Sequence, residues 1–262
     1  MKAKLLILSS IVIFFILIVQ VNTERKISIN YEVSVYKIPI YLKLLDFMNR
    51  HYNYKHLVNN INSNNSTDED KIINTTNWVI SNIKKINLNQ DIDIVDHHPI
   101  TIVERRLGID EQFSDILSVL LVYSDIDSFF KFVKLVNVEA YYPLTFFKIY
   151  NYWSIADPQN GIFFLDEKNN FINIDNLKKK KFYLADNNLT IINNDNFPGY
   201  FDSNFNNFNE IKFFYNQLIV NLPTSNQINS INKFYRGGRS YTQDPLGRIN
   251  YELLKIYNKL MN

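Results

Sequence analysis

Two adjacent acidic side chains, Asp110 and Glu111, stand at the start of a helix that is predicted directly after Gly108, in the stretch RRLGIDEQFSDILSVLL. The amino terminus of a helix presents unpaired N–H groups and the positive end of the helix dipole, which stabilise an anion or lower the pKa of a thiol. Two carboxylates could divide acid and base work there if burial separated their pKa values. Adjacent helical residues diverge by about 100°, however, so the two side chains are not expected to converge on one substrate.

Other reactive side chains are absent or poorly spaced. The chain has no cysteine, which excludes disulfides, thiolate metal sites and thiol nucleophiles together. His97 and His98 are adjacent, so on an extended backbone they would point to opposite faces and rarely share one ion. His51 and His56, on a helix, would lie roughly 140° apart around its axis. The sequence therefore predicts no metal site and no cofactor.

The helix after Gly108 is the most clearly periodic segment of the chain. Its apolar residues recur at helical spacing and predict one buried face; they are Phe113, Ile116, Leu117, Leu120 and Leu121. The residues expected on the opposite, polar face are Ser114, Asp115 and Ser118. A helix packed on one face in this way holds its first turn, and hence Asp110, in a fixed position.

Helices are predicted before this segment and strands after it. One helix begins after Pro39, and a second is capped by Thr67 with Asp70 in the capping-box position. The stripe of the second helix comprises Ile72, Ile73, Thr76, Val79, Ile80 and Ile83. Residues 59–67, rich in Asn and Ser, are predicted to be the loop between the two helices. Alternating runs over residues 129–142 and 143–158 predict strands with a turn near Asn151, and residues 160–177 add a short strand pair. Helices followed by antiparallel strands indicate an α+β domain.

The order of these segments resembles the transglutaminase-like superfamily, which has a papain-like α+β fold. The resemblance rests on NWVISNI, then HHPITIVERRLGIDEQFSDIL, then strands that end in WSIADPQNG, and it covers roughly residues 68–165. Bacterial members open their core helix with a Gly-x-Cys-Asp-Gln type of motif, carry a histidine on the next strand, and carry a Trp and an Asp-Pro pair on the strand after it. The resemblance implies N-terminal helices packed on an antiparallel sheet.

The chemistry of that family needs a cysteine thiolate, a histidine base and an aspartate that orients the histidine. Matched position by position, Asp110 stands where the cysteine should be, and Tyr142 where the histidine should be, with Tyr141 as the next candidate. Asp157 is the triad position that is retained. A carboxylate is a poor nucleophile for acyl transfer, and a phenol with a pKa of about 10 is a weak base near neutrality. No intact catalytic residue is therefore predicted.

The amino terminus and the charge balance bear on the cellular setting and on the class of partner. Lys2 and Lys4 precede an almost unbroken apolar run over residues 5–21, which would span roughly 26 Å as a helix and predicts a single transmembrane signal anchor. A cleaved signal peptide is the alternative. The two lysines are expected to stay in the cytoplasm, with the body of the protein outside it. Because 28 basic and 26 acidic residues nearly balance among 262, nucleic acid is not a predicted partner.

Four regions are expected along the chain: an anchor over 1–25, a helical lead-in with an Asn-rich loop over 26–67, a transglutaminase-like core over 68–185, and an extension over 186–262 that ends in an amphipathic helix from about Arg248. The functional hypothesis is a non-catalytic domain at the outer face of the bacterial inner membrane that binds a peptide, a polysaccharide or an envelope protein. Glu111, Gln112 and Trp153 are the candidate ligand contacts in its degenerate cleft. The alternatives are a hydrolase or acyltransferase with repurposed residues around Asp110, and a purely structural envelope protein.

Overall fold

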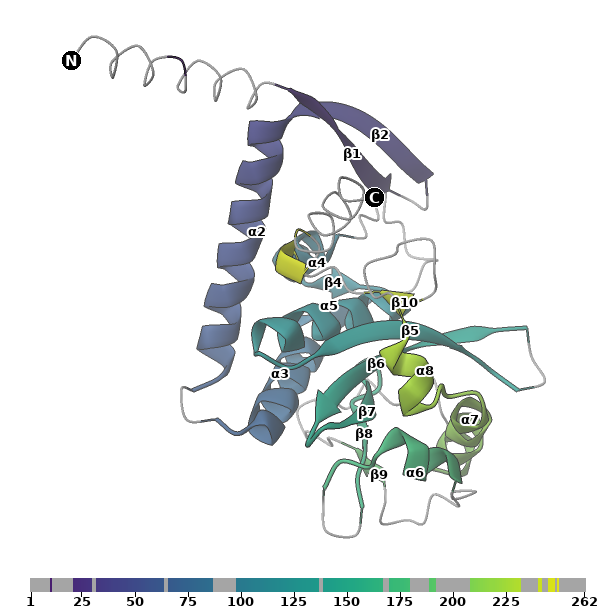
Figure 1. Ribbon diagram of the computed structural model, residues 1–262. Coiled ribbons are helices and arrows are strands. Elements are labelled where there is room, and N and C mark those ends of the chain that lie inside the picture. Colours follow the sequence, from purple (N-terminus) through teal and green to yellow (C-terminus); the bar gives the residue numbers. More distant parts are fainter. Residues whose placement is uncertain are drawn as a thin grey trace.

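The computed structural model describes residues 21–29, 32–63, 66–86, 98–136, 139–166, 170–179, 189–191, 208–231, 240–241 and 245–247, together with Ser10 and Ile249. Helices and strands combine in an α+β fold, as the sequence predicts. Within these residues an antiparallel six-stranded sheet of order β10-β5-β6-β7-β8-β9 lies at the centre (Figure 1). Its strands are β5 (Ser128–Lys134), β6 (Tyr141–Ile149), β7 (Tyr152–Asp157), β8 (Ile162–Phe164), β9 (Leu189–Ile191) and β10 (Ser240–Tyr241).

The turn between β6 and β7 fixes the register of the central strands. Ile149 pairs with Tyr152, so the turn contains two residues, Tyr150 and Asn151. Both have left-handed backbone angles, with φ of 48° and 67°. Two successive residues of this kind give a turn whose twist matches that of the strands on either side. The turn predicted near Asn151 is confirmed.

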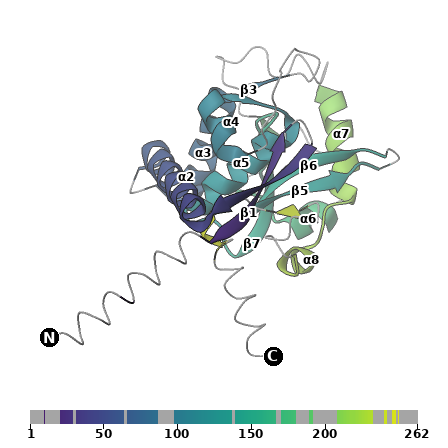
Figure 2. The same ribbon diagram turned by 90° about the horizontal axis from the view of Figure 1, so that it is seen from above.

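Helices cover both faces of the sheet (Figure 2), and the apolar side chains of β6, β7 and β8 alternate between two separate clusters. On β6, Phe147 belongs to the first cluster and Phe146 to the second. The first cluster lies under α2 (Ile40–Ile61), α3 (Asp68–Asn82), α4 (Pro99–Arg105) and α5 (Asp110–Tyr123). The second lies under α6 (Ile174–Lys179), α7 (Phe208–Val220) and α8 (Ser225–Asn229).

Helix α5 lies at the middle of the first cluster, and its predicted apolar face is confirmed: Phe113, Leu117 and Leu120 have no exposed surface. The expectation of a polar, solvated face is wrong. Ser114 and Ser118 are also fully buried, and Asp115 is 3 % exposed. The sheet, α2, α3 and α4 surround the helix, so its hydroxyls bond within the protein. One example is Ser114, whose Oγ donates to the carbonyl of Pro143 at 3.2 Å.

Helix α3 begins as the sequence predicts. The Thr67 hydroxyl accepts from the Asp70 N–H at 3.1 Å, and the Asp70 carboxylate accepts from the Thr67 N–H at 2.9 Å. The predicted stripe is buried at every position except Ile73, which is 37 % exposed. Ile73 follows the fully buried Ile72 by about 100° around the axis and so points outward. The helix ends at Asn82, and the next residues form β3 (Lys84–Lys85).

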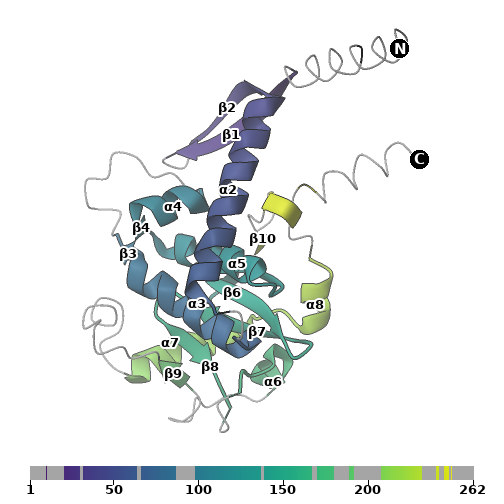
Figure 3. The same cartoon turned by 90° about the vertical axis from the view of Figure 1, so that its left-hand side faces the viewer.

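Helix α2 begins directly after Pro39, as predicted, but it continues to Ile61, so residues 59–61 are helical and the loop is shorter than expected. It follows an antiparallel hairpin of β1 (Asn22–Ile29) and β2 (Glu32–Pro39) (Figure 3). The expectation of a helical lead-in from residue 26 is thus wrong for this stretch. Alternation of apolar and charged residues in KISINYEVSVYKIP was the available signal for these strands.

Two expectations concern the chain ends. Apart from Ser10 and Val21, the predicted anchor over residues 5–21 lies outside the described residues, and so does nearly all of the helix predicted from Arg248. Among the helices that the structure does describe, none combines the length and the apolar composition needed to cross a membrane.

Replacement of Leu117 by alanine tests the central position of α5. We expect Leu117→Ala to lower the free energy of unfolding by about 2–5 kcal/mol, since it removes a fully buried side chain and leaves a cavity. Ile73→Ala is the matched control and should stay within about 0.5 kcal/mol, as surface substitutions do. Urea denaturation of both variants gives the comparison, and equal losses would contradict the placement of the two helices.

Candidate functional site

The start of α5 is held by a short parallel strand pair and by a buried glutamine. Strand β4 (Leu107–Gly108) pairs with β3, and a Cβ at Gly108 would come within 3.0 Å of the Ile83 side chain, so this contact favours glycine. The side-chain oxygen of Gln112 accepts from the N–H of Ile109 at 3.1 Å and from the guanidinium of Arg105 at 2.8 Å. Gln112 is 1 % exposed. It therefore caps the helix and presents no surface to a ligand.

Asp110 is the first residue of α5, and its side chain is 54 % exposed. Its carboxylate lies 3.2 Å from the Nζ of Lys85 on β3, in an ion pair at the surface. The next residue, Glu111, is partly buried, and burial raises the pKa of its carboxyl, with the charge of Asp110 acting in the same direction. The two carboxylates thus sit in different environments, as acid and base work would require.

A buried polar group surrounds Asp157, at the end of β7. Its Oδ2 accepts from the Tyr142 hydroxyl and the Asn160 side-chain amide, both at 2.8 Å, and from the Tyr215 hydroxyl. Its Oδ1 accepts from the backbone N–H groups of Gln159 at 3.0 Å and Asn160 at 3.2 Å. Asp157 has no exposed surface. Five donors therefore satisfy a carboxyl that is closed off from solvent.

Burial governs the titration of this group, which we call the Asp157 cluster (Tyr142, Asp157, Gln159, Asn160 and Tyr215). It raises the pKa of Asp157, while the hydrogen bonds from Tyr215, Tyr142 and Asn160 oppose that rise. It also raises the pKa of both phenols well above the usual value, and the negative Asp157 adds to the rise. The phenols stay protonated near neutral pH and act as donors. Neither can serve as a general base there.

The pairing of the strands decides which face of the sheet carries the Asp157 cluster. Tyr142 shares its face with Leu144 and Phe146, and packs against the second apolar cluster, under α7. Asp157 shares that face with Trp153 and Ile155. Helix α5 packs on the other face. Tyr142 and Asp157 are thus brought together as the resemblance implies, whereas Asp110 is bound to Lys85 and contributes only a minor electrostatic effect on Tyr142.

Trp153, expected as a ligand contact, belongs to the core. It is 2 % exposed, packs edge-on against Phe129 with ring centroids 5.5 Å apart, and donates from Nε1 to Asn229 at 2.9 Å. The sequence analysis missed three members of the Asp157 cluster. Gln159 and Asn160 lie in the quoted ADPQNG motif and could have been suspected. Tyr215 lies outside the span of the resemblance, and no sequence signal connects it with residue 157.

Three of the four histidines lie among the described residues, and each has a local partner. His98 caps α4, and its Nε2 lies 2.9 Å from the Arg50 guanidinium. The Nδ1 of His51 lies 3.0 Å from the Tyr123 hydroxyl, and the Nε2 of His56 lies 3.1 Å from the Asn60 amide. His97 lies outside the described residues. Within the part of the chain that is described, no three His, Asp or Glu side chains form a group that could hold a metal ion.

Comparison with known proteins gives little further guidance. No protein-family model matches the chain, and no curated protein matches it. A solved structure from Cytophaga hutchinsonii, described as a "putative cysteine protease", aligns at 15 % identity with a TM-score of 0.34, over 40 % of this chain and 36 % of that one. A "putative protease" from Parabacteroides distasonis aligns at 10 % identity with a TM-score of 0.33, over 53 % and 37 % of the two chains. The chain spans little more than a third of either structure, and neither similarity is high enough to assign a family.

Removal of one donor from the Asp157 cluster should cost more stability at higher pH. The pKa of Asp157 is higher in the folded protein than in the unfolded chain, so protonation of this carboxyl stabilises the fold. The stabilisation is fully present below the unfolded pKa of about 3.9, and it is lost as the pH rises through the folded pKa. Above that value the carboxylate depends on its donors. We expect Tyr215→Phe to cost about 1–3 kcal/mol near pH 7.5, and less near pH 3.9, which lies below the raised folded pKa.

The matched control is Tyr152→Phe. The Tyr152 hydroxyl donates to the carbonyl of Phe171 at 2.7 Å, so its removal breaks a bond to a neutral acceptor. Its cost should be about 1 kcal/mol at both pH values. Urea denaturation at the two pH values gives all four numbers. A cost of Tyr215→Phe that is the same at both pH values would show that Asp157 does not titrate as proposed.

The placement of Asp110 can be tested with a thiol, because the chain has no other cysteine. We expect the thiol introduced by Asp110→Cys to have a pKa below the ordinary cysteine value of about 8.5, since the helix amino terminus and Lys85 both stabilise a thiolate. Adding Tyr142→His should lower the pKa only slightly, because residue 142 faces the other side of the sheet and interacts only weakly with the charge at residue 110. Adding Lys85→Met should raise it. The rate of alkylation by iodoacetamide against pH reports each pKa. A fall with Tyr142→His as large as the rise with Lys85→Met would contradict the placement.

Proposed function

We propose that the protein is a non-catalytic domain of transglutaminase-like ancestry, held at the outer face of the bacterial cytoplasmic membrane by residues 5–21, and that it acts through its surface. The order of segments that resembles the family supports the ancestry, as does the packing of α5 beneath β5 and β6. The apolar run and the lysines before it support the membrane setting. A peptide, a polysaccharide or another envelope protein is the class of partner.

The single observation that carries this proposal is the closed hydrogen bonding of Asp157. In a Cys-His-Asp enzyme the aspartate orients an imidazole that exchanges protons with the nucleophile and the substrate. Here the corresponding carboxyl bonds two phenols, an amide and two backbone N–H groups, all within the protein. The cluster has no thiol or imidazole, and its one carboxyl is closed off from solvent by five donors of the protein itself.

One observation favours a second candidate function, a hydrolase that uses the acidic pair at the start of α5. Glu111 has a raised pKa through burial, and the neighbouring Asp110 is exposed beside Lys85. Two carboxyl groups in different environments can divide acid and base work in a hydrolase. Because successive helical residues diverge by about 100°, the pair does not face one substrate, and we rank this function second.

The activity test uses the full chain with two general substrates. One assay follows hydrolysis of a casein-derived peptide mixture, and the other follows hydroxamate formation from a glutamine peptide and hydroxylamine. We expect no turnover above the buffer rate in either assay, and no change with Asp110→Asn or Glu111→Gln. Turnover by the unmodified protein that either variant abolishes would overturn the non-catalytic assignment and establish the second candidate.

A further inference from the structure

The first half of α2 carries a row of exposed apolar side chains. Tyr41, Leu45, Met48 and Tyr52 are 40 %, 61 %, 49 % and 63 % exposed. At about 100° per residue these four positions fall within roughly 60° of one another around the helix. We call them the α2 stripe. Leu42 and Leu44, on either side of it, are also exposed, at 42 % and 49 %. Single exposed apolar residues are ordinary, but a contiguous row of them marks an interaction surface.

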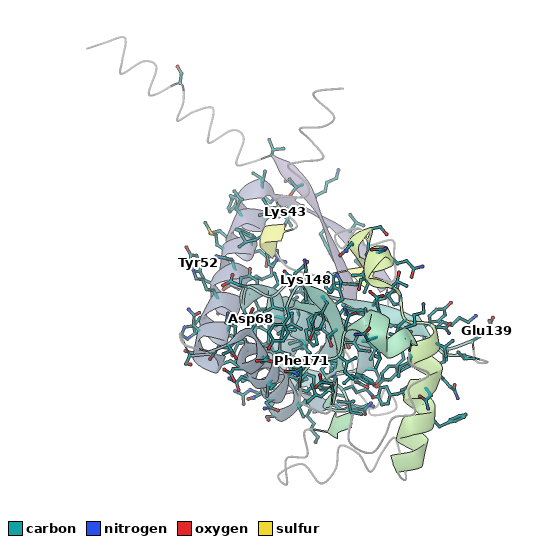
Figure 4. All side chains as sticks on the ribbon, turned by 60° about the horizontal axis from the view of Figure 1, so that its bottom comes forward. Lys43, Tyr52, Asp68, Glu139, Lys148 and Phe171 are labelled. Atoms are coloured by element: carbon teal, nitrogen blue, oxygen red, sulfur yellow. The ribbon has the colours of Figure 1, made fainter. Side chains whose placement is uncertain are left out.

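The α2 stripe does not face the body of the protein. The buried residues of α2 are Tyr54 and Val58, which lie roughly 110–150° around the helix from the middle of the stripe. Figure 4 shows Tyr52 on the outer side of the helix, away from the sheet. Within the described residues nothing packs over this side, so whatever covers the stripe comes from outside the described fold.

The position of the stripe in the chain indicates what covers it. The N–H of Ile40, the first residue of α2, donates to the carbonyl of Val21 at 2.9 Å. Val21 is the last residue of the apolar run that is predicted to enter the membrane. The stripe therefore starts where that run ends. Val35 and Tyr36 on the adjoining strand β2 are also exposed, at 54 % and 49 %.

The residue types of this surface suit the boundary between lipid and water. Tyrosine is enriched at that boundary, because its ring is apolar and its hydroxyl is polar, and Tyr41 and Tyr52 stand at the two ends of the stripe. Lys37, on β2, is exposed at the same end of the protein, where anionic headgroups would meet it. A helix with one apolar side and a polar remainder lies in the plane of the interface, with its apolar side buried about 5–10 Å.

We propose that the α2 stripe is a membrane-surface contact, which lays the first half of α2 along an anionic bilayer and fixes the orientation of the domain above it. The proposal rests on the membrane setting of the proposed function. A helix that begins beside the end of an anchor, as the hydrogen bond from Ile40 to Val21 places α2, cannot diffuse away from the bilayer, so a modest apolar area suffices to keep it there. The spacing of the stripe would also fit a helix of a second copy of this chain, but the connection between Val21 and Ile40 favours lipid.

Single-cysteine variants of the full chain test this contact. Leu45→Cys reports on the stripe, and Asn53→Cys is the matched control, because Asn53 is exposed on the same helix about 100° from Tyr52. Val12→Cys reports on the predicted anchor. Each variant is labelled with an environment-sensitive fluorophore and reconstituted in vesicles of phosphatidylcholine and phosphatidylglycerol, with and without brominated acyl chains. We expect the probe at residue 45 to shift to the blue and lose most of its emission to the brominated lipid, and the probe at residue 53 to do neither.

The other outcomes separate the inference from the proposed function. Quenching at residue 12 without quenching at residue 45 overturns the stripe contact and leaves the anchor in place. Quenching at residue 45 alone supports the contact and refutes the anchor. A blue shift at residue 45 that brominated lipid does not quench shows that protein covers the stripe, and the contact with lipid is then wrong. Absence of any effect at residues 12 and 45 overturns both.

Discussion

The buried carboxyl of Asp157 imposes the strictest physical demand in this protein. A charged group without exposed surface is costly unless its oxygens are satisfied, and breaking such a set leaves an uncompensated buried charge. The five donors come from three separate parts of the chain: the start of β6, the turn after β7, and α7. The position of α7 over the sheet therefore depends on this carboxyl, as does the conformation of the turn at residues 158–161. Trp153 and Asn229 join α8 to the same face of the sheet.

The same hydrogen bonds distinguish Asp157 from the aspartate of a catalytic triad. In a catalytic triad the aspartate accepts a hydrogen bond from an imidazole and orients it. Here Asp157 accepts hydrogen bonds from two phenols and helps to keep them protonated. Helix α5, at whose start a nucleophile would stand, packs on the opposite face of the sheet. Its first residue, Asp110, forms an ion pair with Lys85 at the surface. Tyr142 and Asp157 thus belong to the buried Asp157 cluster, and Asp110 lies at an exposed helix end.

The two ends of the α2 helix serve different purposes. Its second half, with Tyr54 and Val58, belongs to the core beside α3 and α5. Its first half extends past the core, adjoins the β1–β2 hairpin and exposes its large apolar side chains. One continuous helix therefore connects the core of the domain with the point where the chain leaves the predicted anchor.

The sequence alone determined the features that depend on neighbouring residues. The Thr67 capping box, the start of α2 after Pro39, the apolar face of α5 and the turn at Asn151 are all encoded within a few positions, because caps, helical periodicity and turn angles are local properties. The tertiary structure decided the rest. Ser114, Asp115 and Ser118 look like a solvated face until a sheet and three helices enclose them, and Ile73 looks like core until its side of α3 is left uncovered. Strand pairing placed Tyr142 and Asp157 on one face and α5 on the other, and the packing of α7 brought Tyr215 to a carboxyl 58 residues away along the chain. Such contacts depend on which elements meet in space, a property that no local pattern of residues records.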